Sequence, residues 1–69
     1  MKLRIKDERQ VGGHAVYLVT REVDGLPQWE VVVDCIRQYI GGETGARSKF
    51  RAWARQLGIN AKRRARSEH

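Results

Sequence analysis

The chain has 69 residues, of which 41% are hydrophobic and 32% charged, and its formal net charge is +6. This length supports one small domain with a thin core, and the single cysteine, Cys35, excludes an internal disulfide and an all-cysteine metal site. The start of the chain shows no signal-peptide pattern, and no apolar run approaches the roughly 20 residues needed to cross a bilayer. We therefore expect a cytoplasmic protein without a membrane partner.

The positive charge is concentrated in the last third of the chain. Residues 1–43 carry six basic and seven acidic side chains, a net charge of −1, whereas residues 44–69 carry eight basic side chains and one acid, a net charge of +7. Such asymmetry is typical of proteins that bind polyanions.

Strand patterns occupy the N-terminal half. Residues 1–6 alternate apolar and basic side chains, which predicts a half-buried strand with a charged outer face. Residues 7–13 are polar and end in two glycines, which predicts a loop. Residues 14–23 are rich in β-branched and aromatic side chains, which predicts a second strand.

A hairpin over residues 14–33 is the clearest local prediction. Asp24-Gly25 is typical of a tight turn, because glycine adopts positive φ without a steric penalty. Pro27 lacks an N–H donor, so we expect the return strand to cover residues 28–33. The predicted faces of that strand are Trp29, Val31 and Val33 on one side and Glu30 and Val32 on the other.

Residues 34–40 fit two structures. Asp34 can cap a short helix that places Ile36, Tyr39 and Ile40 on one side. Alternation of Ile36, Gln38 and Ile40 also fits a strand. We favour the helix.

The stretch "GGETGARSK", residues 41–49, resembles the phosphate-binding loop of P-loop nucleotidases. Only Ser48 stands where that motif requires it, and one hairpin cannot supply the parallel sheet behind such a loop. We interpret the stretch as the start of a helix over residues 45–57, with Thr44 as the N-cap and Gly58 as the C-terminal stop.

The predicted helix has an apolar stripe beside a row of arginines. Its apolar side chains fall within an arc of about 100°; they are Ala46, Phe50, Trp53, Ala54 and Leu57. Arg47, Arg51 and Arg55 repeat every four residues along one flank, and Lys49 falls on the opposite flank. Like charges at this spacing repel, so the row favours contact with a polyanion; the alternative is that the arginine stems cover apolar surface while their heads face water.

Residues 59–69 form a basic extension, which we expect to be flexible and to follow a domain over residues 1–58. The stretch "AWARQLGINAKRRA" also resembles the middle of a helix-turn-helix, with Gly58 in the turn. That resemblance implies that residues 60–66 read a DNA groove. Arg64, however, stands where the second helix of the motif buries an apolar residue.

No constellation of catalytic or metal-ligating residues is recognisable. His14 and His69 are too few, and too far from any cluster of carboxylates and Cys35, to indicate a metal site. We expect no enzymatic activity, no cofactor and no metal.

Together these patterns predict an α+β domain, with an antiparallel sheet of two or three strands packed against one amphipathic helix. The function we expect is a small non-enzymatic regulator of transcription type that binds the phosphate backbone of DNA or RNA. The alternative is an inhibitor or adaptor that docks on an acidic surface of a large protein machine such as RNA polymerase. The predicted nucleic-acid-binding residues are Arg47, Lys49, Arg51, Arg55, Lys62, Arg63, Arg64 and Arg66.

Overall fold

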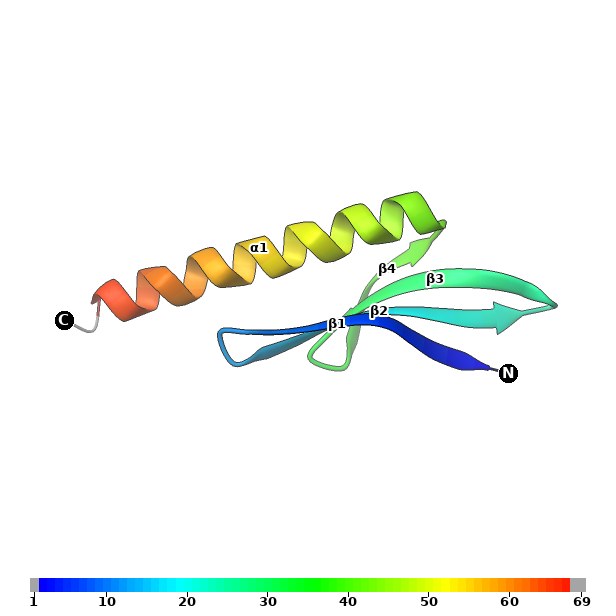
Figure 1. Cartoon of the computed structure of the whole chain (residues 1–69), viewed down its shortest axis with the longest axis horizontal. Helices are drawn as coiled ribbons and strands as arrows, with labels where there is room; N and C mark the ends of the chain where they lie inside the picture. The colour runs from blue at the N-terminus through cyan, green and yellow to red at the C-terminus, as the bar shows by residue number, and fades with distance from the viewer. Residues whose placement is uncertain (1, 68–69) are drawn as a thin grey trace.

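The computed structural model describes residues 2–67. Four antiparallel strands in the order β1-β2-β3-β4 form one open sheet, and a single long helix lies along one face of it (Figure 1). The elements are β1 (Leu3–Val11), β2 (His14–Val23), β3 (Leu26–Val33), β4 (Ile36–Gly41) and α1 (Glu43–Ser67). The α+β class is confirmed, and the sheet has four strands where two or three were expected.

Three two-residue turns connect the strands, and every central residue has a positive φ. This geometry matches the right-handed twist of the flanking strands. The turns are Gly12-Gly13, Asp24-Gly25 and Asp34-Cys35. Only the last has no glycine, which is why the sequence did not reveal it.

The segment after Asp34 is a strand, and the helix favoured for residues 34–40 is wrong. Asp34 and Cys35 have φ values of 50° and 69°, which turn the chain back so that β4 pairs with β3. The Asp34 carboxylate fixes this turn. Its Oδ2 is hydrogen-bonded to Nδ1 of His14, and its Oδ1 accepts from the Ala15 N–H at 3.0 Å. The His14 hydrogen bond first, and then the Ala15 bond, hold the pKa of Asp34 below its usual value.

Strands β1 and β3 both extend further than expected. β1 continues to Val11, so residues 7–11 are a strand and only Gly12-Gly13 form the turn. β3 begins at Leu26, and Pro27 is its second residue and pairs with Glu22 of β2. The hairpin around Asp24-Gly25 is therefore confirmed, with a return strand two residues longer than expected.

The core lies between the sheet and α1. Alternate residues of β2 and β3 meet the apolar stripe of the helix, as the strand and helix periods predict. The buried cluster comprises Val16, Leu18, Val31, Val33, Ala46, Phe50 and Leu57, with Val11, Trp29, Tyr39 and Trp53 packed against it.

Helix α1 is continuous from Glu43 to Ser67, so the expected bounds of 45–57, the N-cap at Thr44 and the stop at Gly58 are all wrong, and residues 59–67 of the expected flexible extension belong to the helix. The Ala46 N–H donates to the Gly42 carbonyl at 3.0 Å, which places Thr44 inside the first turn and not at the N-cap. Gly58 lies within the helix and does not end it. The helix-turn-helix resemblance therefore fails, because no turn separates residues 53–57 from residues 60–66. Glu68 and His69 of the expected extension lie outside the described residues.

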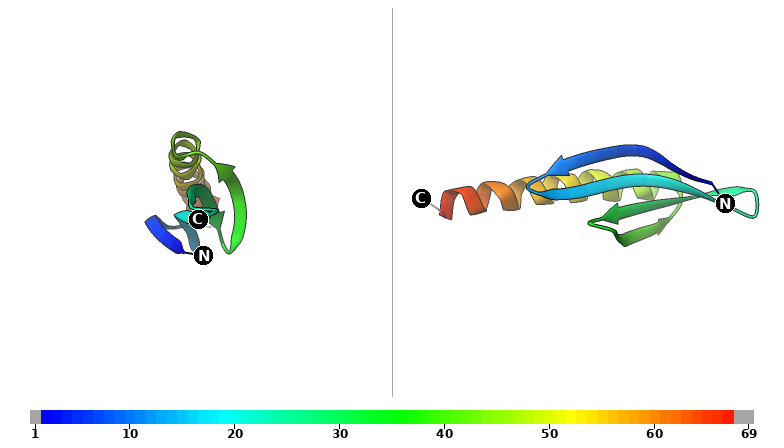
Figure 2. Two further views of the ribbon diagram at one scale, coloured as in Figure 1. Left: turned by 90° about the vertical axis from the view of Figure 1, so that its right-hand side faces the viewer. Right: turned by 90° about the horizontal axis from the view of Figure 1, so that it is seen from below.

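The molecule is elongated, with extents of 52 × 19 × 15 Å. The 25 residues of α1 span about 37 Å at 1.5 Å per residue, and Figure 2 shows the helix on one face of the sheet, with the opposite face uncovered by any other element of residues 2–67. Within the same residues, no helix has both the length and the apolar character needed to span a membrane.

Candidate nucleic-acid interface

A β-bulge in β1 decides which of its side chains face the helix. The register with β2 shifts between Ile5 and Asp7, so Lys6 is the extra residue. Before the bulge, Arg4 pairs with Thr20 on the helix side; after it, Arg9 pairs with the core residue Val16. Directly paired residues share a face of the sheet. Lys2, Arg4, Lys6 and Arg9 therefore all lie along the side of β1 that faces α1.

A second row of cations runs along α1. At 100° per residue, four basic residues fall within about 80° of one another around the helix; they are Arg47, Arg51, Arg55 and Lys62, and all four are exposed. Lys62 belongs to this row only because the helix continues past Gly58. If the helix ended there, the side of the molecule on which Lys62 lies could not be derived from the helical period.

Two hollows lie along these rows on the helix side of the sheet. One, of about 490 Å³, is lined by residues of β1, β2, β3 and the β2–β3 turn, among them Lys2, Arg4, Lys6 and Trp29, and by none of α1. A second, of about 360 Å³, lies further along and is lined by Arg9, Arg51 and Arg55 around the apolar side chains of Val11, Phe50 and Ala54. We call these two hollows and their basic residues the β1–α1 groove. The basic residues that line it are Lys2, Arg4, Lys6, Arg9, Arg51 and Arg55, and we include Arg47, which lies over Trp29 of the first hollow.

Acidic side chains offset only part of this charge. Nε of Arg47 donates to Oε2 of Glu43 at 2.8 Å, and the same guanidinium lies 5.2 Å from the centre of the Trp29 ring. Both interactions hold Arg47 beside Trp29, which lines the first hollow. Glu22 and Asp7 lie on the same side of the sheet. Seven cations therefore face three acids, and the groove keeps a strong positive charge.

The remaining predicted residues lie elsewhere on α1. Lys49 and Arg63 are exposed on the side of the helix turned away from the Arg47–Arg55 row, about 160–200° around the axis from Arg47. Arg64 reaches the β1–β2 turn, where Nη2 donates to the Gly12 carbonyl at 3.1 Å. Arg66 belongs to the last turn of α1. The structure thus brings Arg47, Arg51, Arg55 and Lys62 together and separates them from Lys49, Arg63 and Arg64.

Sequence reasoning missed the contribution of β1. Lys2, Arg4 and Lys6 were interpreted as the outer, solvated face of a strand, and Arg9 as part of a loop. Arg9 is separated from Leu3 and Ile5 by an even number of positions, so a regular strand would place all three on one face. The bulge moves Arg9 to the other face. The repeated basic residues at positions 2, 4 and 6 were the available signal.

Residues 2–67 contain no group of three His, Cys, Asp or Glu side chains placed to hold a metal ion. Comparisons with known protein families, with curated proteins and with solved structures found no match.

Proposed function

We propose that this protein is a non-enzymatic, cytoplasmic regulator of transcription type that binds nucleic acid through phosphate contacts in the β1–α1 groove. The observation that carries the proposal is the meeting of Arg9 of β1 with Arg51 and Arg55 of α1, from elements far apart in sequence, around one hollow. Guanidinium groups present forked donors that match phosphate oxygens, and Arg9, Arg51 and Arg55 converge on the same hollow.

The arrangement suits backbone contact more than reading of bases. Long, flexible cationic side chains line the groove, and no glutamine or asparagine is among the residues that line either hollow. Amide side chains and bidentate arginines aimed at base edges are the usual means of sequence readout. We therefore expect weak sequence preference and strong dependence on salt.

The test is a salt titration of binding to labelled random-sequence DNA and RNA, single- and double-stranded, followed by fluorescence anisotropy. With five or six phosphate contacts, the logarithm of the association constant should fall with the logarithm of salt concentration at a slope of about −4 to −5. Binding that is flat with salt, or absent at about 100 mM NaCl, would contradict the proposal.

Matched variants locate the contact. Arg51→Ala and Arg9→Ala should each lower affinity about eightfold at about 100 mM salt and make the slope shallower by about 0.9, as expected for one lost phosphate contact. Arg63→Ala removes the same charge from the opposite side of α1 and should change neither quantity. A loss for Arg51→Ala without a loss for Arg9→Ala would restrict contact to the helix and remove the groove from the proposal.

The protein-partner alternative gives a different result in the same assay. An acidic surface of a large protein such as RNA polymerase would satisfy the same cations, but it would leave random nucleic acid unbound at moderate salt.

A further inference from the structure

The face of the sheet opposite α1 is rich in apolar side chains, and no element of residues 2–67 covers it. Seven large apolar side chains are exposed within residues 2–67, and the strand pairing places five of them on this face: Leu3, Ile5, Val23, Leu26 and Ile40. Leu3 and Ile5 are 55% and 59% exposed, so the expectation that the apolar side of the first strand is buried is wrong. We call this surface the outer face.

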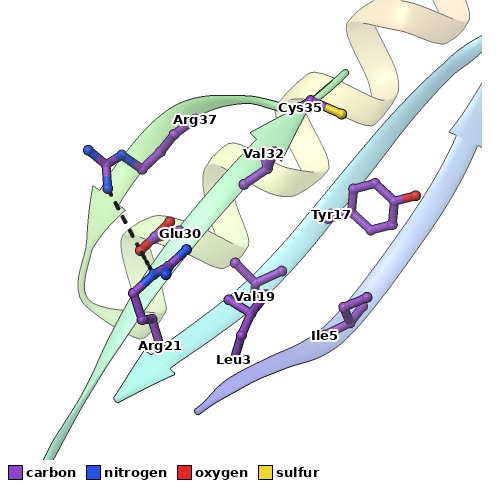
Figure 3. A pocket seen from close by; sticks show the side chains of 9 residues that line it. All are labelled: Leu3, Ile5, Tyr17, Val19, Arg21, Glu30, Val32, Cys35 and Arg37. Atoms are coloured by element: carbon purple, nitrogen blue, oxygen red, sulfur yellow. Dashed lines mark hydrogen bonds and ion pairs between the residues drawn. The ribbon is translucent and has the colours of Figure 1, made fainter. Parts of the chain in front are cut away.

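A hollow of about 440 Å³ lies at the centre of the outer face. The apolar side chains around it come from three strands, β1, β2 and β3, and Figure 3 shows them on the side of the sheet away from the helix. Patches of this kind on a small protein mark interaction sites.

The charged groups at this centre already satisfy one another. Glu30 is 1% exposed; its Oε2 accepts from Nε of Arg21 at 3.1 Å and lies 3.9 Å from Nη1 of Arg37 (Figure 3). No buried side-chain nitrogen or oxygen of the described residues lacks a hydrogen-bond partner. Covering this face therefore does not isolate an unpaired charge, which is the main cost of burying polar groups.

The outer face is close to electroneutral, in contrast to the groove on the other side of the sheet. Its central charged residues are Arg21, Arg37, Glu30 and Glu8, since Glu8 pairs with Tyr17 on this side. The outer face has no excess of positive charge to attract a polyanion. The partner that fits it is another apolar surface with balanced charge.

One row of paired residues across the sheet, which we call a rung, carries opposite charges at its two ends and can therefore pair with the same row of a second copy. The pairings Glu8–Tyr17, Tyr17–Val32 and Val32–Arg37 form a line across all four strands, negative at the β1 edge and positive at the β4 edge. A two-fold axis parallel to the strands stacks two copies face to face and reverses the strand order while keeping each rung level. Glu8 of each copy then lies over Arg37 of the other.

The next rung fits the same operation. Ile5, Val19, Glu30 and Ile40 are linked by pairing in the same way, so Ile5 of one copy lies over Ile40 of the other. At its edges the symmetric contact thus has two apolar pairs and two ion pairs, and between them Tyr17 lies over Val32 and Val19 over Glu30 of the other copy. Aligned packing of two sheets about 10 Å apart is a common arrangement.

We propose that two copies of this chain associate through their outer faces in an isologous dimer. Four strands about 4.8 Å apart and about 27 Å long give a face of about 500 Å², which lies at the lower end for a specific interface. We expect a dissociation constant of about 10–100 µM. The dimer leaves both β1–α1 grooves open, on opposite sides of the assembly.

The test is sedimentation equilibrium of the full chain without nucleic acid, from about 5 µM to about 500 µM. The apparent mass should rise from 8.0 kDa towards twice that value. A mass that stays at that of the monomer throughout would overturn the proposal and leave the face to a partner of different sequence. Because no nucleic acid is present, the result is independent of the proposed function.

A charge swap tests the specific geometry. Glu8→Arg and Arg37→Glu should each weaken self-association at least about tenfold, because each places like charges at two symmetric contacts; Arg37→Glu also puts a second carboxylate beside Glu30 of its own chain. The double variant should associate at least about tenfold more tightly than Arg37→Glu alone, since the contacts between copies are again complementary while the Glu30 contact is the same in both. Glu8 and Arg37 lie on opposite edges of one sheet, about 14 Å apart at the usual strand spacing, so only pairing between copies can produce this rescue. Folded variants that show no rescue would overturn the geometry.

A neutral variant pair serves if either charge variant does not fold. Ile40 and Ile36 are both exposed in β4, at 43% and 64%, but Ile36 pairs with the core residue Val33 on the helix side. Ile40→Ser should weaken the dimer at least about fivefold and Ile36→Ser should leave it unchanged. Equal effects of the two substitutions would overturn the proposal.

Discussion

Gly12 and Gly13 share a turn but have different surroundings. Both have positive φ, at 57° and 83°, where any residue with a Cβ is strained. A Cβ at Gly12 would lie 2.8 Å from the Ala61 Cβ, whereas a Cβ at Gly13 would meet nothing within 4 Å. Gly12 therefore serves both the turn and the contact between the hairpin tip and the helix.

Replacing each glycine by alanine separates these two roles. Gly13→Ala should cost about 1–2 kcal/mol of unfolding free energy through backbone strain alone. Gly12→Ala should cost about 1–3 kcal/mol more, because the added methyl overlaps the helix. Urea denaturation measures both. Equal losses would show that the hairpin tip does not press on α1 at Ala61.

Asp34 makes stability depend on pH at low values. Its pKa is lowered in the folded state by the hydrogen bonds from His14 and Ala15. The stabilisation is therefore fully present above the unfolded pKa of about 3.9 and is lost as the pH falls through the lower, folded value.

An NMR titration of the Asp34 carboxyl should give a midpoint below about 3.9, the value for an unperturbed aspartate. Asp34→Asn keeps an acceptor for the Ala15 N–H and tolerates positive φ, but it cannot ionise. Its stability should therefore fall less than that of the wild type as the pH drops through the acidic range. A midpoint at or above the unperturbed value would contradict the hydrogen-bonding arrangement.

At the scale of elements, the decisive feature is the continuity of α1. Gly58 followed by Ile59 matches the sequence pattern of a helix end, yet Gly58 lies in the helix interior and packs beside Val11 of β1. Contacts of the last turns with the β1–β2 turn, including the bond from Arg64 to Gly12, support the helix beyond Gly58. Tertiary packing commonly outweighs a local propensity of about 1 kcal/mol.

Because Gly58 lies inside the helix, its replacement by alanine should stabilise the protein. Gly58→Ala should raise the unfolding free energy by about 0.5–1 kcal/mol, since its Cβ would lie 3.7 Å from Cγ1 of Val11, an ordinary contact. A glycine that ended the helix would give a loss instead. Thermal or urea unfolding distinguishes the two signs.

Gly45 is the matched control for that substitution. It is also helical, but a Cβ there would lie 2.1 Å from the hydroxyl oxygen of Tyr39. Gly45→Ala should therefore destabilise the protein although alanine is the better helix former. A gain at both positions would mean that Tyr39 does not occupy the space beside the first turn.

At the scale of the whole molecule, the sheet separates two chemistries. Its helix side carries the β1–α1 groove, with an excess of cations, while its outer face is apolar and nearly neutral. The predictions on salt-dependent binding and on dimerisation both follow from this division. Because the two surfaces lie on opposite faces, neither process should block the other.

Local patterns were sufficient for the elements with strong signals. The hairpin around Asp24-Gly25, the faces of β3 and the apolar stripe of α1 were all predicted, because each depends on a single period or turn dipeptide within a few residues. The strand β4 was not predicted, because the turn before it consists of Asp34 and Cys35, whereas turns with this geometry usually contain glycine. The polar stretch over residues 7–11 was predicted to be a loop because its composition carries no strand signal. It is an edge strand because it pairs with β2, a contact that the local sequence does not reveal.

The sequence by itself determined the class of the fold, the amphipathic helix and the excess of cations after residue 43. Only the tertiary structure decided which cations meet, because one extra residue at Lys6 reverses the faces of β1 and brings Arg9 beside Arg51 and Arg55. The same reversal moves Glu8 to the outer face. A strand's side-chain period is two, so a single inserted residue exchanges its two faces, and such an insertion is defined by the partner strand and not by the residues around it.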